Sequence, residues 1–190
     1  MRTLLTIVVL AGVLHAQETK PKHDFPTDEE IKLAVLQSER AVADYKQAVA
    51  LEASLPTTQK DATSLDTDKH LIELFPKLLE AIKQTPSRFD GLAGLLLLTT
   101  LDDASRNAAL CGNSAMGDIA QELLSTRDTA KIYRIMAISQ KCIDTSTELY
   151  TVSESVHALY VKATEAQEEL SQEAEDTLNK CVAALQKGKK

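Results

Sequence analysis

The sequence predicts an all-α protein, a single-domain bundle of about five to seven helices. Its apolar residues are mainly Leu, Ile, Val and Ala, with four Tyr, three Phe and no Trp, and this composition favours helices over a sheet. Residues 118–187 contain neither Gly nor Pro, so they are permissive for long helices. The most apolar run of the chain outside its first residues is 91–101. We expect long amphipathic N- and C-terminal helices to surround a buried Leu-rich helix.

The N-terminus has the layout of a secretory signal peptide. Arg2 supplies a positive charge, residues 4–14 are apolar, and Ala16 offers a small residue before a cleavage site. An apolar run of this length is too short to span a bilayer comfortably, because a helix needs roughly 20 residues. We therefore expect a secreted or periplasmic protein, cleaved near Ala16. The expected organisation is a signal peptide at 1–16, a flexible lead-in at 17–27, an all-helical domain at 28–186 and a basic tail at 187–190.

The first two helices follow from capping and periodicity. Thr27 and Glu30 form a capping box, and apolar residues at alternating spacings of three and four predict a helix to about Ser54. A second helix covers the apolar residues between Leu71 and Ile82. Pro76 lies inside this stretch and is expected to kink the helix or to begin a new one.

The central helix is expected to begin at Ser87, which precedes Asp90 with the spacing of a capping box, and to end at Cys111, since Gly112 is suited to terminate a helix. Its leucines cover more than half of its circumference, and a helix that is apolar nearly all round is buried. A short helix should follow, with a turn at residues 125–128. The leucines that we expect to be buried in the central helix are Leu92, Leu95, Leu96, Leu98 and Leu101.

Two seams with a period of seven run along the C-terminal third of the chain. The apolar seam is Ile135, Cys142, Leu149, Val156, Ala163 and Leu170. The parallel seam is Ile132, Ser139, Ser146, Ser153 and Tyr160, and small residues of this kind allow two helices to approach closely. We expect helix breaks within 144–148, where Thr145 and Glu148 could form a cap, and near Ser171.

The three cysteines predict a disulfide in an oxidising compartment, because their spacing does not match a compact zinc site. Cys111 and Cys142 are placed symmetrically about the turn at 125–127, so an antiparallel hairpin would bring them together. This pair is our candidate disulfide. The alternative, Cys142 with Cys181, is symmetric about a stretch without turn residues.

The chemical motifs give little support for an enzyme. His70 with Glu73, and His157 with Glu154 and Tyr150, have the spacing of polar helix edges. Asp102, which adjoins Asp103, is expected to form an exposed surface pair with Arg106, four residues later. We identify no catalytic, cofactor-binding or metal-binding residues, and no G-x-S-x-G, P-loop or dinucleotide-binding pattern is present.

These observations favour an exported, non-enzymatic interaction or adaptor module, with self-association along the C-terminal helix as one expected outcome. A carrier of a small apolar ligand, held between helices, is the alternative, and a carboxylate- or His157-based enzyme is the weakest hypothesis. The net charge of −7 argues against nucleic acid as a partner. We expect no cofactor and no stable membrane span in the mature chain.

Overall fold

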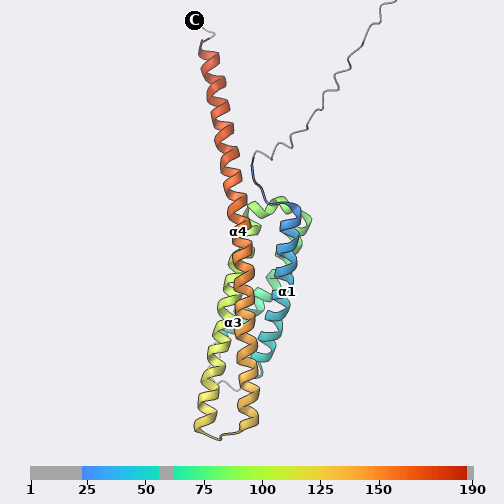
Figure 1. The fold of residues 1–190 in the computed structure, drawn as a ribbon, viewed down its shortest axis with the longest axis vertical. Coiled ribbons are helices and arrows are strands. Elements are labelled where there is room, and N and C mark those ends of the chain that lie inside the picture. The colour runs from blue at the N-terminus through green and yellow to red at the C-terminus, as the bar shows by residue number, and fades with distance from the viewer. Residues whose placement is uncertain (1–22, 56–61, 188–190) are drawn as a thin grey trace, which may run out of the picture.

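The computed structural model describes residues 23–55 and 62–187, and this part of the chain is an all-helical bundle (Figure 1). It contains α1 (Asp28–Glu52), α2 (Ala62–Gln84), a 3₁₀ helix η1 (Pro86–Asp90), α3 (Leu92–Leu124) and α4 (Thr129–Lys187). The expected number of five to seven helices was therefore too high, because several predicted breaks lie inside α3 and α4. The expected signal peptide at 1–16 and residues 17–22 of the expected lead-in lie outside the described residues.

The sequence signals for α1 are confirmed. The Thr27 side chain accepts a hydrogen bond from the Glu30 backbone, and the Glu30 side chain accepts one from the Thr27 backbone. The face carrying Val35, Val42 and Tyr45 is buried. Together, the cap and this apolar face account for the position of the helix, because a cap fixes the first turn while burial supplies most of the stability.

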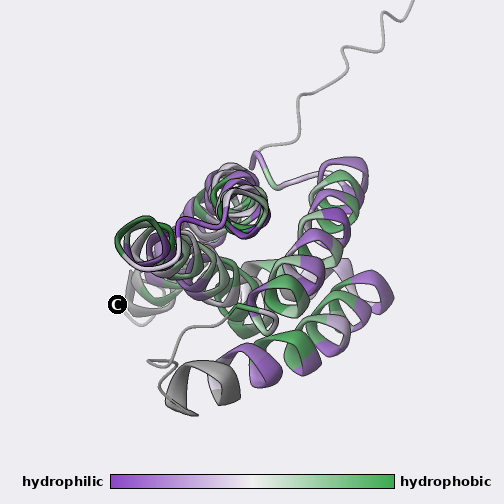
Figure 2. Ribbon diagram, turned by 90° about the horizontal axis from the view of Figure 1, so that it is seen from below, coloured by the Kyte–Doolittle hydropathy of each residue, from purple (hydrophilic) through white to green (hydrophobic). Residues whose placement is uncertain are grey.

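Pro76 neither breaks α2 nor starts a new helix. The residue is exposed, so the Ile72 carbonyl that loses its donor can bond water instead. Leu71, Phe75 and Ile82 lie on the opposite, buried side of α2. Burial of apolar side chains before and after Pro76 therefore keeps α2 continuous across the proline. Viewed along the bundle, hydrophilic residues of the outer helices face away from the interior (Figure 2).

The expected start of the central helix at Ser87 was wrong. Residues 86–90 form η1, and α3 begins after Gly91, which makes no side-chain cap. The tighter 3₁₀ segment buries Phe89 in the main core. It also brings the Phe89 carbonyl against Gly94, where a Cβ atom would lie 1.9 Å from that oxygen. The close approach explains why glycine occupies this position in a helix.

The expected end of the central helix at Cys111, with Gly112 as its terminator, was also wrong, because α3 continues to Leu124. Gly112 serves packing instead. A Cβ atom at this position would lie 2.9 Å from Ile143 Cγ1 of α4, and the Gly112 carbonyl accepts a hydrogen bond from Ser139 Oγ at 3.2 Å. The residue lets α3 and α4 approach each other, which is worth more here than the helix propensity that glycine lacks.

The leucine run is only partly buried, which corrects the expectation of a helix enclosed on all sides. Leu97 and Leu101 are fully buried, whereas Leu92, at 71% exposure, Leu95 and Leu96 are exposed. α2 and α4 both pack against α3. These neighbours cover two sides of the run and leave a third side open.

The predicted serine seam lies at the contact between α3 and α4. Ser105 Oγ donates to the Ser146 carbonyl at 3.0 Å, and Ser146 Oγ donates to the Ser105 carbonyl at 2.9 Å. Ser153 Oγ donates to Asp102 Oδ1. These reciprocal bonds satisfy polar groups between two closely packed helices, and buried polar groups normally require such partners.

Cys111 and Cys142 form a disulfide between α3 and α4, with a Cα–Cα distance of 5.9 Å. The hairpin turns at residues 125–128, where Asp128 Oδ1 accepts from the Ala130 and Lys131 backbones and caps α4. The pair proposed from the symmetry of the turn is thus the pair that the fold joins. Among the described cysteines, Cys181 is free and exposed.

No break divides α4, so the breaks expected within 144–148 and near Ser171 were wrong. Thr145 is buried within the helix, and the hydroxyl groups of Thr147 and Ser171 donate to carbonyls one turn earlier, those of Ile143 and Gln167. A hydroxyl that bonds back in this way does not act as a cap. The apolar seam keeps these residues helical as far as the bundle extends.

Two glycines of α3 provide a matched test of this packing. Gly94→Ala should destabilise the fold by about 1–3 kcal/mol, since the new methyl group meets backbone atoms of Phe89. Gly117→Ala should stabilise it by about 1 kcal/mol, because nothing lies within 4 Å and alanine has the higher helix propensity. Urea denaturation followed by circular dichroism measures both changes, and stabilisation by both variants would contradict the close approach at Gly94.

Candidate functional site

The length of α4 beyond its partner helix defines the candidate functional site. Leu92, the first residue of α3, lies 19 positions before Cys111, and the residue 19 positions after Cys142 is Val161. The antiparallel pairing with α3 therefore ends near Val161, while α4 continues for 26 further residues to Lys187. Figure 1 shows the C-terminal part of α4 extending beyond the other helices. We call residues 168–187 the projecting segment.

The buried face of α4 continues along the projecting segment. The apolar seam is buried from Ile135 through Ala163, and its next member, Leu170, is 39% exposed. The same face then carries Ala174, Leu178 and Cys181. Leu178 is 63% exposed. Large apolar side chains are exposed elsewhere on the molecule too, but Leu170 and Leu178 continue the face with which α4 packs against the core.

Charges along this part of the chain are divided by sign. Residues 165–176 contain six acidic residues and no basic residue, whereas residues 177–190 contain four lysines and no acidic residue. The acidic residues are Glu165, Glu168, Glu169, Glu173, Glu175 and Asp176. The segment therefore has a negative half near the bundle and a positive half away from it.

The foot of the projecting segment is held by polar contacts to the lead-in and to α1. His23 Nδ1 lies 3.1 Å from Glu169 Oε2, and His23 Nε2 lies 3.4 Å from Glu173 Oε2. Lys162 Nζ lies 3.1 Å from Glu30 Oε1. The Thr27 backbone, followed by Lys162, lowers the pKa of Glu30. Residues 23–27, the described part of the expected flexible lead-in, thus include contacts to α4.

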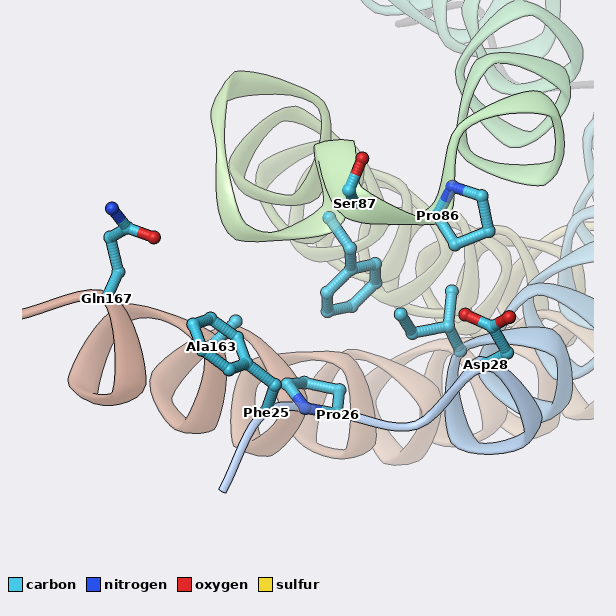
Figure 3. A pocket seen from close by; sticks show the side chains of 9 residues that line it. Phe25, Pro26, Asp28, Pro86, Ser87, Ala163 and Gln167 are labelled. Atoms are coloured by element: carbon cyan, nitrogen blue, oxygen red, sulfur yellow. The ribbon is translucent and has the colours of Figure 1, made fainter. Parts of the chain in front are cut away.

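An apolar pocket of about 300 Å³ opens at the same end of the bundle (Figure 3). Phe25 and Pro26 of the lead-in form one side, Pro86 of η1 another, and Ala163 with Gln167 of α4 a third. Ile31 and Phe89 also line the pocket. Its volume lies at the lower end of the roughly 300–1,000 Å³ of small-molecule sites.

A second, more polar groove lies between α3 and α4 and contains His157 with Asp102, Arg106, Tyr150 and Glu154. Ser153, which is buried, donates to Asp102, and no hydrogen bond joins it to His157 in the described part of the chain. The expected partner of Arg106, Asp102, was wrong, because Arg106 Nη1 lies 3.6 Å from Asp103 Oδ1 and Asp102 accepts the hydroxyl of Ser153.

The other candidates from the sequence do not form a site. His70 and Glu73 are both exposed on α2. Within the described residues, no group of three or more His, Cys, Asp or Glu side chains could hold a metal ion. In the same part of the chain, no helix combines the length and the apolarity needed to cross a membrane.

A buried polar cluster joins α1, α2 and α3, and sequence reasoning missed it. Tyr45 Oη donates to Asp68 Oδ1 at 2.5 Å, and Asn107 Nδ2 donates to the same oxygen at 3.0 Å. Asp68 is only 2% exposed. Asp68 precedes Leu71 by three residues and Phe75 by seven, so it lies on the apolar stripe of α2. This carboxylate on an apolar face was the sequence signal that could have identified the cluster. We regard the cluster as structural because each contact is internal.

In comparisons with known proteins, no protein-family model, no curated protein and no solved structure matches the chain. Fold and surface together define an all-helical bundle protein with a long projecting C-terminal helix.

The Tyr45 cluster predicts a pH dependence of stability. Burial, followed by the hydrogen bond to Asp68, raises the pKa of Tyr45 in the fold. The stabilisation is therefore complete below the unfolded pKa of about 10 and is lost as the pH rises above it, by about 1.4 kcal/mol per pH unit. The difference in unfolding free energy between wild type and Tyr45→Phe should shrink between pH 9 and 11. A constant difference across this range would contradict the assignment.

Proposed function

We propose that this protein is an exported, non-enzymatic interaction module that binds a helical protein partner along its projecting segment. The observation that carries the proposal is the exposure of Leu170 and Leu178 on the face that is buried earlier in α4. A helix with an apolar stripe is the element that helix-in-groove and coiled-coil partners recognise. In such complexes the apolar residues that recur at i, i+4 and i+7 insert into the groove of the partner.

The lack of packing around the projecting segment supports this proposal. In proteins most of the stability of a helix comes from tertiary packing of an amphipathic face, and most of residues 168–182 are exposed. The projecting segment contains intrahelical contacts such as Gln172 Nε2 to Asp176 Oδ1 at 3.3 Å, but such pairs contribute only about 0.2–0.5 kcal/mol each. Burial of the apolar stripe against a partner would supply the missing stabilisation. The segment is thus built to gain order when it binds.

Export remains part of the proposal on the strength of the N-terminal pattern. A charge at Arg2, an apolar stretch and Ala16 form the order of a signal peptide. A disulfide between Cys111 and Cys142 suits an oxidising compartment. Both features support a secreted or periplasmic location for the mature chain.

Site-specific photocrosslinking in the source cells tests the interaction. A photoreactive amino acid at position 178 should capture a protein in a band identified by mass spectrometry. The matched control is Asn179, which is also exposed but lies on the opposite side of the helix from the stripe. Equal capture at both positions, or none at 178, would remove the support for this surface.

The second candidate function is a carrier of a small apolar ligand, as considered from the sequence. The pocket between the lead-in, η1 and α4 favours it, since Phe25, Ile31 and Phe89 are apolar and the site is about 300 Å³ in volume. A hollow of similar size at Leu92 and Leu96 provides a weaker alternative location. Either hollow would take a short acyl chain or a single-ring compound.

Native mass spectrometry with a series of short fatty acids tests the carrier hypothesis. Ser87 lines the pocket and is exposed, so Ser87→Trp should fill the mouth without disturbing the core. Wild type should bind one ligand and show a raised Tm, and the tryptophan variant should lose at least tenfold in affinity. A ligand that binds both proteins equally does not occupy this pocket, and the absence of any complex ends the hypothesis.

A further inference from the structure

The apolar pocket at the end of the bundle is continuous with the exposed apolar stripe of the projecting segment. Ala163 and Gln167 of α4 line the pocket (Figure 3). Leu170 and Ala174 follow on the same face, because the successive spacings from Ala163 onward are four, three and four residues. Gln167 precedes Leu170 by only about 4.5 Å along the helix axis. A helix that lies along the stripe therefore reaches the pocket at the edge of the bundle.

Acidic side chains line both edges of the stripe in the half next to the bundle. Glu168 and Glu175 lie on one edge, because seven residues are close to two full helical turns. Glu169 and Glu173 lie on the other edge, four residues apart. Residues 165–176 contain no basic residue. The first half of the stripe thus runs between two rows of carboxylates.

The basic side chains described at this end of the bundle already have acidic neighbours. Lys162 Nζ lies 3.4 Å from Asp24 Oδ1 in addition to its contact with α1, and His23 is engaged as described above. In the described part of the chain, no ion pair involves Glu168 or Glu175. A partner that brings positive charge to these edges is attracted to them, whereas a negative partner is repelled.

The pocket suits one side chain of the same partner. Its volume of about 300 Å³ is at the lower limit for a small-molecule site, and Phe25, Ile31 and Phe89 give it an apolar lining. In protein interfaces a few side chains, often Tyr or Trp, carry most of the binding energy where they fill a pocket. Because a helix on the stripe ends beside Gln167, its terminal turn is the part that meets the pocket.

We propose that the pocket and the stripe form one docking surface for a basic amphipathic helix of a partner protein, which places one aromatic side chain of its terminal turn in the pocket. The proposal rests on the interaction role proposed above and adds the charge and the anchor of the partner. The surface covers residues 163–181, about 27 Å along α4, so a helix of about 18 residues matches it.

Three synthetic amphipathic helices of about 18 residues test the charge and the anchor. All carry Leu and Ala on one face. The first has lysines along both edges of that face and a tyrosine in each terminal turn, the second has glutamates in place of the lysines, and the third has alanines in place of the tyrosines. In isothermal titration calorimetry with the full chain, the first peptide should bind at least tenfold more tightly than either of the others. Equal binding of the lysine and glutamate peptides would overturn the proposal, and so would equal binding of the tyrosine and alanine peptides.

Charge reversal in the protein separates this surface from general attraction to a negative molecule. Glu168→Lys/Glu175→Lys should weaken the first peptide at least tenfold, because one row of carboxylates becomes positive. The matched control is Glu73→Lys/Glu80→Lys, which changes the net charge equally, with the same spacing, at exposed positions of α2. The control should lose less than threefold. Equal losses in the two variants would overturn the docking surface.

The pocket variant Ser87→Trp locates the anchor. It should weaken the tyrosine peptide as much as removal of its tyrosines does, and it should leave the alanine peptide unchanged. Equal weakening of both peptides, or a small apolar ligand that occupies the pocket without displacing the tyrosine peptide, would overturn the anchor.

Photocrosslinking at position 178 distinguishes failure of this inference from failure of the interaction role. If the lysine peptide does not bind and position 178 captures a partner without a basic helix, or only a second copy of this chain, the inference is wrong and the interaction role stands. If position 178 also captures nothing, both are wrong.

Discussion

The close antiparallel pairing of α3 and α4 is the interaction on which the rest of the structure depends. It combines a disulfide, a glycine against Ile143 and serine pairs that bond each other's backbones. The glycine and the serines are small residues that let the two helices approach closely, and such residues recur along the contact between α3 and α4. The pairing fixes the direction of α4, and α1 and α2 complete the core against this hairpin.

The projecting segment is a consequence of unequal helix lengths. α3 has 33 residues and α4 has 59, and the pairing begins at their shared turn. The surplus must therefore leave the bundle at the opposite end. The sequence is adapted to this departure, because the apolar residues continue while the charges divide into an acidic and a basic half. A terminal helix selected only for solubility would not require the apolar stripe.

Signals that act within one helix turn or through long periodicity could be read from the sequence. The capping box at Thr27, the two seams of α4 and the pairing of Cys111 with Cys142 belong to this group. The errors at Gly112, Thr145 and Ser171 arose where a local break signal was overruled by packing or by a hydroxyl bonding back along the helix. Ser87 failed because a 3₁₀ turn buries Phe89.

The candidate site could be predicted only in part, for a physical reason. The seam of small and apolar residues indicated a helix that packs along its length, and self-association was an expected result. Where the antiparallel pairing stops depends on where α3 begins, at Leu92, and on how the disulfide between Cys111 and Cys142 aligns α3 with α4. The exposure of Leu170 and Leu178 follows from this alignment, because both residues lie beyond the level of Leu92.

Amide hydrogen exchange along α4 tests the central claim, that one continuous helix is held by α3 in its first part and awaits a partner in its last. In dilute protein, amides from Ile135 to Ala163 should be strongly protected, and protection should fall sharply beyond Leu170. When a protein captured at position 178 is added, protection of residues 168–187 should rise while that of the hairpin stays constant. Protection of the projecting segment equal to that of the hairpin in dilute protein alone would contradict the account.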